Sequence, residues 1–190
     1  MPHFRINFVC KQVYATVTGG FMVRDEFAQE KPEVVTKTMA AWLRGIEFVK
    51  DRDTNEEAIF RYMEEFYAEQ GVTLSRDAME EDMRLIKLYS LDEQIALMER
   101  KSDPPSSQFD FWTIDISEFM LKNGVLASYP APVDYITDEF FLDIKDDPQL
   151  AAYGRGQDPG PSQPADSATG MLKGFFPLLL CFVWAMVYRW

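Results

Sequence analysis

Apolar and polar residues alternate at the start of the chain and then change to a helical spacing. Phe4, Ile6 and Phe8 alternate with polar neighbours, and Thr18-Gly19-Gly20 offers a turn. A period of two is typical of β-strands that bury one face. We therefore expect two or three short strands between residues 4 and 23.

From Lys31 onwards, apolar residues recur every three or four positions, which is the spacing of amphipathic helices. Pro32 and Glu33 suit the first turn of a helix that continues to Val49. Further helices are expected where a capping residue precedes an apolar stripe: at Thr54 to Glu57, at Ser75, at Ser90 to Glu93, over 109–123, after Thr137 and after Asp147. Gly71 and Gly124 are natural helix ends. The pattern predicts a mainly α domain with a small β element.

The last twenty residues, Met171 to Trp190, are almost entirely apolar, and no charge lies between Lys173 and Arg189. Twenty helical residues span about 30 Å, the thickness of a bilayer's hydrocarbon core. The pattern predicts one C-terminal transmembrane helix, and a buried core helix is the alternative. The expected anchor residues are Phe175, Phe176, Leu178, Leu179, Leu180, Phe182, Val183, Trp184, Met186, Val187 and Tyr188.

A segment rich in Gly, Pro, Ser and Asp separates this apolar end from the rest of the chain. Such a composition buries little and is typical of flexible linkers. We therefore divide the chain into a soluble domain over 1–153, a flexible linker over 154–170 and a membrane anchor over 171–190.

The charge is concentrated in the expected soluble part. The whole chain holds 19 Lys and Arg against 31 Asp and Glu, a net charge of −12. An acidic surface disfavours nucleic acid and direct docking on anionic lipid. It favours solubility or a basic protein partner.

Candidate chemistry is sparse. His3 is the one histidine, which disfavours a His-based metal site or a Ser-His-Asp triad. The run 51–55 begins like a calcium loop, but Glu56 replaces its glycine, so a helix connection is favoured. Arg24 and Arg44 suit either an anionic solute or surface ion pairs. The aromatic residues Phe109, Phe111, Trp112 and Phe119 suit either a small-molecule pocket or a core. No catalytic, cofactor-binding or metal-binding residue is expected, and the ligand-binding residues stay unknown.

Several ordered segments resemble one family. The run from Gly19 to Ala28, followed by Lys31 to Val35, resembles solute-binding proteins of ABC importers for sulfonates, taurine and nitrate. Further matching segments are Ala41 to Gly45, Glu65 to Tyr67, Gly71 to Ser75, Ser90 to Gln94 and Asp134 to Asp138. The resemblance covers roughly residues 10 to 153 and corresponds to the C-terminal half of such a protein. It implies a partial lobe of the type II periplasmic-binding-protein fold.

A complete member of that family closes two α/β lobes on its solute, whereas the resemblance here covers one. We therefore expect a protein that is not an enzyme but a single-span accessory or scaffolding subunit, whose partners are the bilayer and integral membrane subunits. The alternative is a membrane-anchored receptor for small anions that serves an ABC importer. The expected location is the inner membrane, with the domain cytoplasmic if Met1 is the true start and periplasmic if family ancestry governs.

Overall fold

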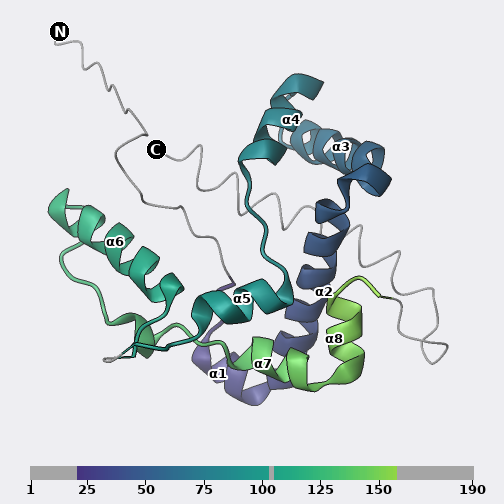
Figure 1. Ribbon diagram of the computed structural model, residues 1–190. Helices are drawn as coiled ribbons and strands as arrows, with labels where there is room; N and C mark the ends of the chain where they lie inside the picture. Colours follow the sequence, from purple (N-terminus) through teal and green to yellow (C-terminus); the bar gives the residue numbers. More distant parts are fainter. Residues whose placement is uncertain (1–20, 103–104, 158–190) are drawn as a thin grey trace, which may run out of the picture.

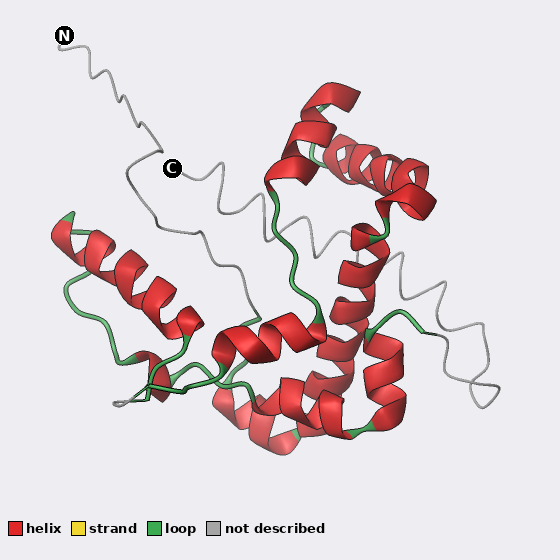
Figure 2. Cartoon of the chain, viewed as in Figure 1, coloured by secondary structure: helices red, strands yellow, loops and turns green. Residues whose placement is uncertain are grey.

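The computed structural model describes residues 21–102 and 105–157, which form helices joined by loops (Figures 1 and 2). The helices are α1 (Asp25–Glu30), α2 (Pro32–Lys50), α3 (Arg52–Glu69), α4 (Arg76–Leu85), α5 (Leu91–Met98), α6 (Gln108–Lys122), the short 3-10 helix η1 (Pro132–Asp134), α7 (Glu139–Asp146) and α8 (Pro148–Gly154).

The predicted β element is wrong for the part of it that the structure describes. Phe21, Met22 and Val23 form no strand, and none occurs elsewhere in the described residues. The ring of Phe21 packs edge-on against Trp42 of α2 at 5.2 Å, while Met22 is exposed. This segment is therefore held by a side-chain contact rather than by strand pairing. The rest of the predicted β region, 4–20, lies outside the described residues.

The predicted transmembrane helix, and with it a single-pass membrane protein, is not supported either. In the parts of the chain that the structure describes, no helix combines the length and the apolar character needed to cross a bilayer. The longest two, α2 and α3, carry charged residues throughout. The expected anchor at 171–190 lies outside the described residues.

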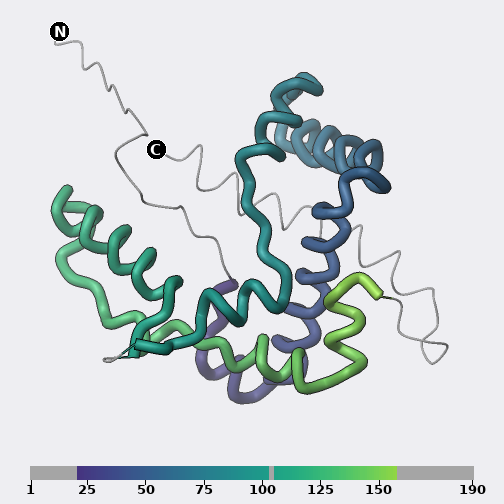
Figure 3. Tube along the Cα trace, in the orientation of Figure 1, coloured from purple at the N-terminus to yellow at the C-terminus, as the bar shows by residue number. Residues whose placement is uncertain are grey.

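The long helix α2 runs from α7 and α8 to α3 and α4 (Figure 3), and its side chains contribute to two hydrophobic cores. Its apolar stripe packs on α5, α7 and α8 along most of its length. That first core contains Val35, Met39, Ala40, Leu43, Ile46, Leu91, Met98, Phe140, Phe141, Ile144 and Ala151. At its C-terminal end, Val49 joins a second core with α3 and α4, which contains Ile59, Phe60, Met63, Phe66, Tyr67, Met79 and Met83. The pair α3 and α4 therefore extends from the far end of α2.

Most helix ends lie where capping chemistry places them. The Ser75 hydroxyl accepts a hydrogen bond from the Ala78 amide at 3.3 Å, and Ser90 and Glu93 form the predicted capping box. Gly71 has the positive φ of a C-terminal cap. The box predicted at Thr54 is wrong, because α3 already begins at Arg52.

Candidate functional site

The helix α6 is rich in large apolar residues, yet its buried residues are Asp110 and Ser117. The large apolar side chains are exposed or half-buried: Phe109, Phe111, Trp112, Ile114, Ile116, Phe119, Met120 and Leu121. An amphipathic helix of a globular domain normally buries such a stripe. Here α6 packs on α5 and η1, at one side of the molecule in Figure 1, and the residues that it buries fully are polar. Phe111, Phe119 and Leu121 of α6 therefore remain exposed on the surface.

An ion pair at the N-terminus of α6 fixes this unusual orientation. Asp110 is 4 % exposed, and its carboxylate accepts hydrogen bonds from Arg100 Nε at 2.8 Å and from the Ser107 amide at 2.9 Å. The Ser107 hydroxyl in turn accepts from the Asp110 amide at 3.0 Å, completing a capping box. Arg100 also donates to the Ile136 carbonyl at 3.1 Å. One guanidinium thus joins the end of α5, the start of α6 and the segment before α7.

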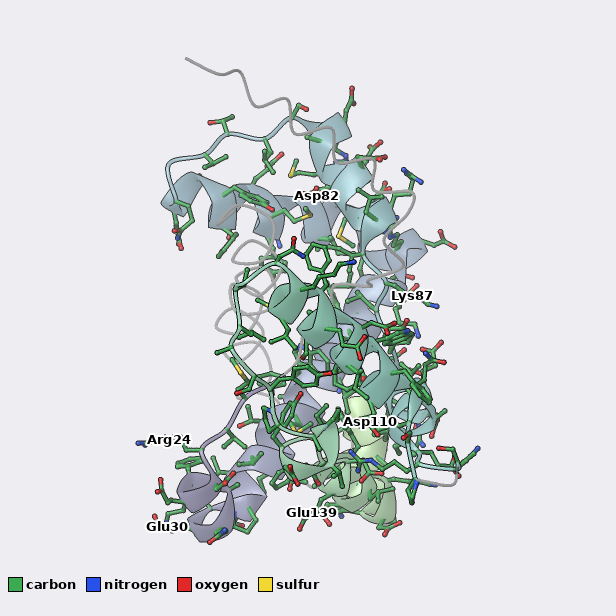
Figure 4. All side chains as sticks on the ribbon, turned by 90° about the vertical axis from the view of Figure 1, so that its left-hand side faces the viewer. Arg24, Glu30, Asp82, Lys87, Asp110 and Glu139 are labelled. Atoms are coloured by element: carbon green, nitrogen blue, oxygen red, sulfur yellow. The ribbon has the colours of Figure 1, made fainter. Side chains whose placement is uncertain are left out.

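The protonation states follow from these contacts. Burial disfavours the ionised form of Asp110, but hydrogen bonds from Arg100 and Ser107 outweigh it and hold the pKa of this carboxyl below its usual range. The hydrogen bond to Asp110 raises the pKa of Arg100. Both groups are charged at neutral pH, so the pair is a true salt bridge. In Figure 4, which faces the α6 side of the molecule, Asp110 lies in the lower half.

The outer surface of α6 carries a carboxylate between two aromatic rings. Phe111, Asp115 and Phe119 follow one another at four-residue spacing, so each is turned by about 40° from the last and they form one strip. Phe111 is 50 % exposed and Phe119 41 % exposed. Asp115 is exposed and makes no ion pair with another described residue. We call these three residues the α6 strip.

Other exposed apolar residues lie close to α6 in the sequence. Half of the large exposed apolar residues in the described part of the chain fall between residues 111 and 135: Phe111, Phe119, Leu121, Val125, Val133 and Tyr135. Contacts between α6 and η1 bring the two ends of this segment together. Such a concentration is typical of an interaction surface rather than of scattered surface residues.

A second candidate site is a pocket at the junction of the two cores. Its volume is about 280 Å³, and it is lined by Val49, Lys50, Arg52, Met83, Ile86, Lys87 and Leu88. Three of these residues are cationic and none is acidic, although acidic residues outnumber basic ones in the whole chain. A half-apolar, half-cationic lining suits a small organic anion.

The cations of this pocket are held in different ways. Lys50 donates to Glu93 at 2.8 Å, and hydrogen bonds from Lys50 and Ser90 lower the pKa of Glu93 to about 2. The guanidinium of Arg52 donates to the Met83 carbonyl and thereby joins α3 to α4. The ammonium of Lys87 lies 5.0 Å from the ring centre of Tyr89 and is labelled in Figure 4. Glu93 neutralises Lys50, so Arg52 and Lys87 supply the net positive charge.

The predicted aromatic residues differ in how far they are buried. Phe111 and Phe119 are exposed on the surface of α6, and Trp112 is half-buried with its ring 6.3 Å from that of Tyr89. Phe109 packs against the edge of the first core. The core interpretation is therefore wrong for Phe111 and Phe119.

The remaining predicted residues have structural positions. Arg24 precedes α1 at the surface, and Arg44 donates to the Gln157 carbonyl at 3.2 Å and lies over the ring of Tyr153. Asp51 precedes α3 as the predicted helix connection. No group of three or more metal-ligating side chains occurs among the described residues. His3 and the expected anchor residues, from Phe175 to Tyr188, lie outside them.

Comparison of the chain with protein-family models, with curated proteins and with solved structures found no match. The resemblance to solute-binding proteins of ABC importers therefore stays a prediction.

The sequence analysis singled out Phe111 and Phe119 of the α6 strip but missed Asp115, the Arg100–Asp110 pair and the residues of the pocket. The spacing Ser107-x-x-Asp110 is a readable capping pattern and would have placed the start of α6. For the pocket, no local pattern existed, because Lys50 and Lys87 are brought together by the chain reversal through α3 and α4.

Proposed function

We propose that this chain is an accessory subunit of a protein complex, and that it binds its partner through the surface of α6. The observation that carries the proposal is the exposure of Phe111, Phe119 and Leu121 on α6. Exposed apolar patches rimmed by polar residues are typical of protein interaction sites. A catalytic role has no comparable support, since neither site combines a nucleophile with a positioned base.

The attachment of α6 supports the same conclusion. A helix held by a buried Arg100–Asp110 pair and a capping box has a defined position before any partner arrives. Such preorganisation lowers the entropic cost of association. Aromatic residues, which dominate binding energy at interfaces, lie on the exposed side of this helix.

Site-specific crosslinking tests this proposal. A photoreactive amino acid replaces Phe111 in one form of the protein and Leu85 of α4 in a control form. Leu85 is an apolar residue on the α3–α4 pair and is 66 % exposed. In extracts of the cells that make the protein, we expect a defined product from position 111 that is absent from position 85.

The partner protein found in that product is then purified without the crosslink, and its affinity for the unmodified chain is measured. The double variant Phe111→Ser/Phe119→Ser should weaken binding by at least about thirtyfold, because loss of even one interface aromatic that dominates binding costs about 2 kcal/mol. Identical products from both positions, or full affinity of the double variant, would contradict docking through α6.

The pocket favours a second candidate function, the binding of small anions such as sulfonates, taurine or nitrate. Its support is the convergence of Lys50, Arg52 and Lys87 on one cavity. Titration calorimetry with each anion tests it, with Lys87→Glu as the variant and Lys145→Glu on α7 as the control. Saturable heat that Lys87→Glu abolishes and the control keeps is the expected result. Absence of binding, or equal loss in both variants, would eliminate this candidate.

A further inference from the structure

We propose that the α6 strip binds an amphipathic helix that carries a Lys or Arg midway between two apolar residues. This inference rests on the proposed function and identifies the chemistry of the partner. The strip presents Phe111, Asp115 and Phe119 in that order. The partner is therefore defined by the residues that cover the two rings and by the residue that covers the carboxylate between them.

The spacing of the residues in the strip suits contact with a second helix. Phe111 and Phe119 are eight residues apart, so their Cα atoms are separated by about 12 Å along the axis of α6. Two apolar residues at the same separation on a facing helix meet both rings at once. The residue midway between them then lies opposite Asp115. A near-antiparallel or near-parallel helix satisfies this requirement, since the arrangement is the same in both directions.

Asp115 determines the charge of that middle residue. It is exposed and lies beside no cation that forms an ion pair with it in the described structure. A partner that covers both rings removes much of the water around this carboxylate, which is costly unless a donor replaces the water. A Lys or Arg replaces it with a charge-assisted hydrogen bond. An apolar residue leaves the carboxylate unpaired, and an acidic residue adds repulsion.

The surroundings of the strip favour the same partner. Glu118 on α6 and Asp134 on η1 are exposed and make no ion pair with a described residue, while Lys122 is the one exposed cation of α6. The whole chain has a net charge of −12. A second copy of this chain would bring like charges together and place Asp115 near its own equivalent. A basic partner is thus favoured over self-association.

Three synthetic peptides test the inference on the full chain. Each is an amphipathic helix of about eighteen residues with two leucines eight positions apart, long enough to span the strip. The peptides differ at the middle position, which is Lys, Glu or Ala. Fluorescence anisotropy gives the dissociation constant of each. We expect the Lys peptide to bind about tenfold or more tightly than the Glu peptide, and to weaken as salt rises.

Two substitutions test whether the Lys peptide is attracted by Asp115 itself or by the negative charge of the chain in general. Asp115→Lys should invert the preference, so that the Glu peptide binds more tightly than the Lys peptide. Glu64→Lys makes the same charge change at an exposed site on α3 and should leave the preference unchanged. If Glu64→Lys reduces binding of the Lys peptide as much as Asp115→Lys does, the attraction is general and the inference is overturned.

The outcomes distinguish this inference from the proposed function. Equal binding of the Lys and Glu peptides, with loss of both in Phe111→Ser/Phe119→Ser, overturns the basic partner but keeps α6 as a docking surface. Binding that survives the double variant contradicts both proposals. Failure of all three peptides to bind overturns the basic helix as partner and leaves the crosslinking experiment to decide the docking function.

Discussion

Removal of Arg100 tests whether the buried ion pair holds α6 in place. In Arg100→Met, Asp110 loses two hydrogen bonds, at 2.8 and 3.0 Å, and keeps the one from the Ser107 amide. The side chain of Asp110 is 5 % exposed and that of Arg100 22 %. Removing one partner of a buried pair costs about 3–5 kcal/mol, and the partial exposure of Arg100 places the expected loss near the lower limit.

The second substitution Asp110→Asn should rescue much of this loss. Asparagine keeps the size of the side chain and an oxygen that accepts from Ser107, but it buries no charge. We expect the double variant to be about 1 kcal/mol less stable than the wild type. Its difference from Arg100→Met measures the cost of an unpaired buried carboxylate.

The dependence on pH has a defined sign. In the wild type, folding lowers the pKa of Asp110. The ionised carboxylate therefore stabilises the fold at pH values above the pKa that Asp110 has in the unfolded chain, and this stabilisation is lost as the pH falls through the pKa that it has in the folded protein. In Arg100→Met, burial raises this pKa instead, so the deficit of the variant should shrink as the pH falls towards about 4.

Urea unfolding followed by circular dichroism measures these differences, and hydrogen exchange of the amides over 108–122 locates them in α6. A loss below about 0.5 kcal/mol for Arg100→Met would refute the reasoning, since that is the range of ordinary surface changes. A double variant as unstable as the single one would refute it equally.

Three further predictions concern the rest of the fold. Glu93→Gln should cost about 1 kcal/mol at pH 7, well below the full value of its pKa shift because the side chain is 51 % exposed, and the difference should shrink between pH 4.5 and about 2. Met63→Ala, in the second core, should cost about 3 kcal/mol in urea unfolding, whereas Leu85→Ser should change little. Gly124→Ala, at φ +71°, should lower the melting temperature, with a cost of about 1 kcal/mol; an unchanged melting temperature would contradict it.

Helix starts and ends were the features that sequence predicted best. Ser75, Ser90 and Asp147 cap the helices that follow them, and Gly71 and Gly124 end the helices before them. Capping is local chemistry between residues two to four positions apart, so it can be read without the fold. Thr54 shows the limit of the method. Its capping pattern lies inside α3, because a single residue, Asp51, separates α2 from α3.

The exposure of α6 was not predictable by the same means. The spacing of its apolar residues indicates a helix but does not say which side faces the protein. That side is chosen by Asp110, whose partner Arg100 lies ten residues earlier, beyond the reach of a helical pattern. The candidate site on α6 therefore arises from a contact between elements, while the helix itself arises from its own sequence.

The segment between α4 and α5 links both candidate sites to the two cores. Leu88 packs against both cores, and Lys87 and Leu88 line the cationic pocket. The next residue, Tyr89, lies with its ring 6.3 Å from that of Trp112 on α6. A substitution at Leu88 should therefore disturb the pocket and both cores, and a substitution at Tyr89 should disturb its contact with Trp112 on α6. Asp115 lies on the outer surface of α6, so its substitution changes the docking surface while leaving the pocket and both cores intact.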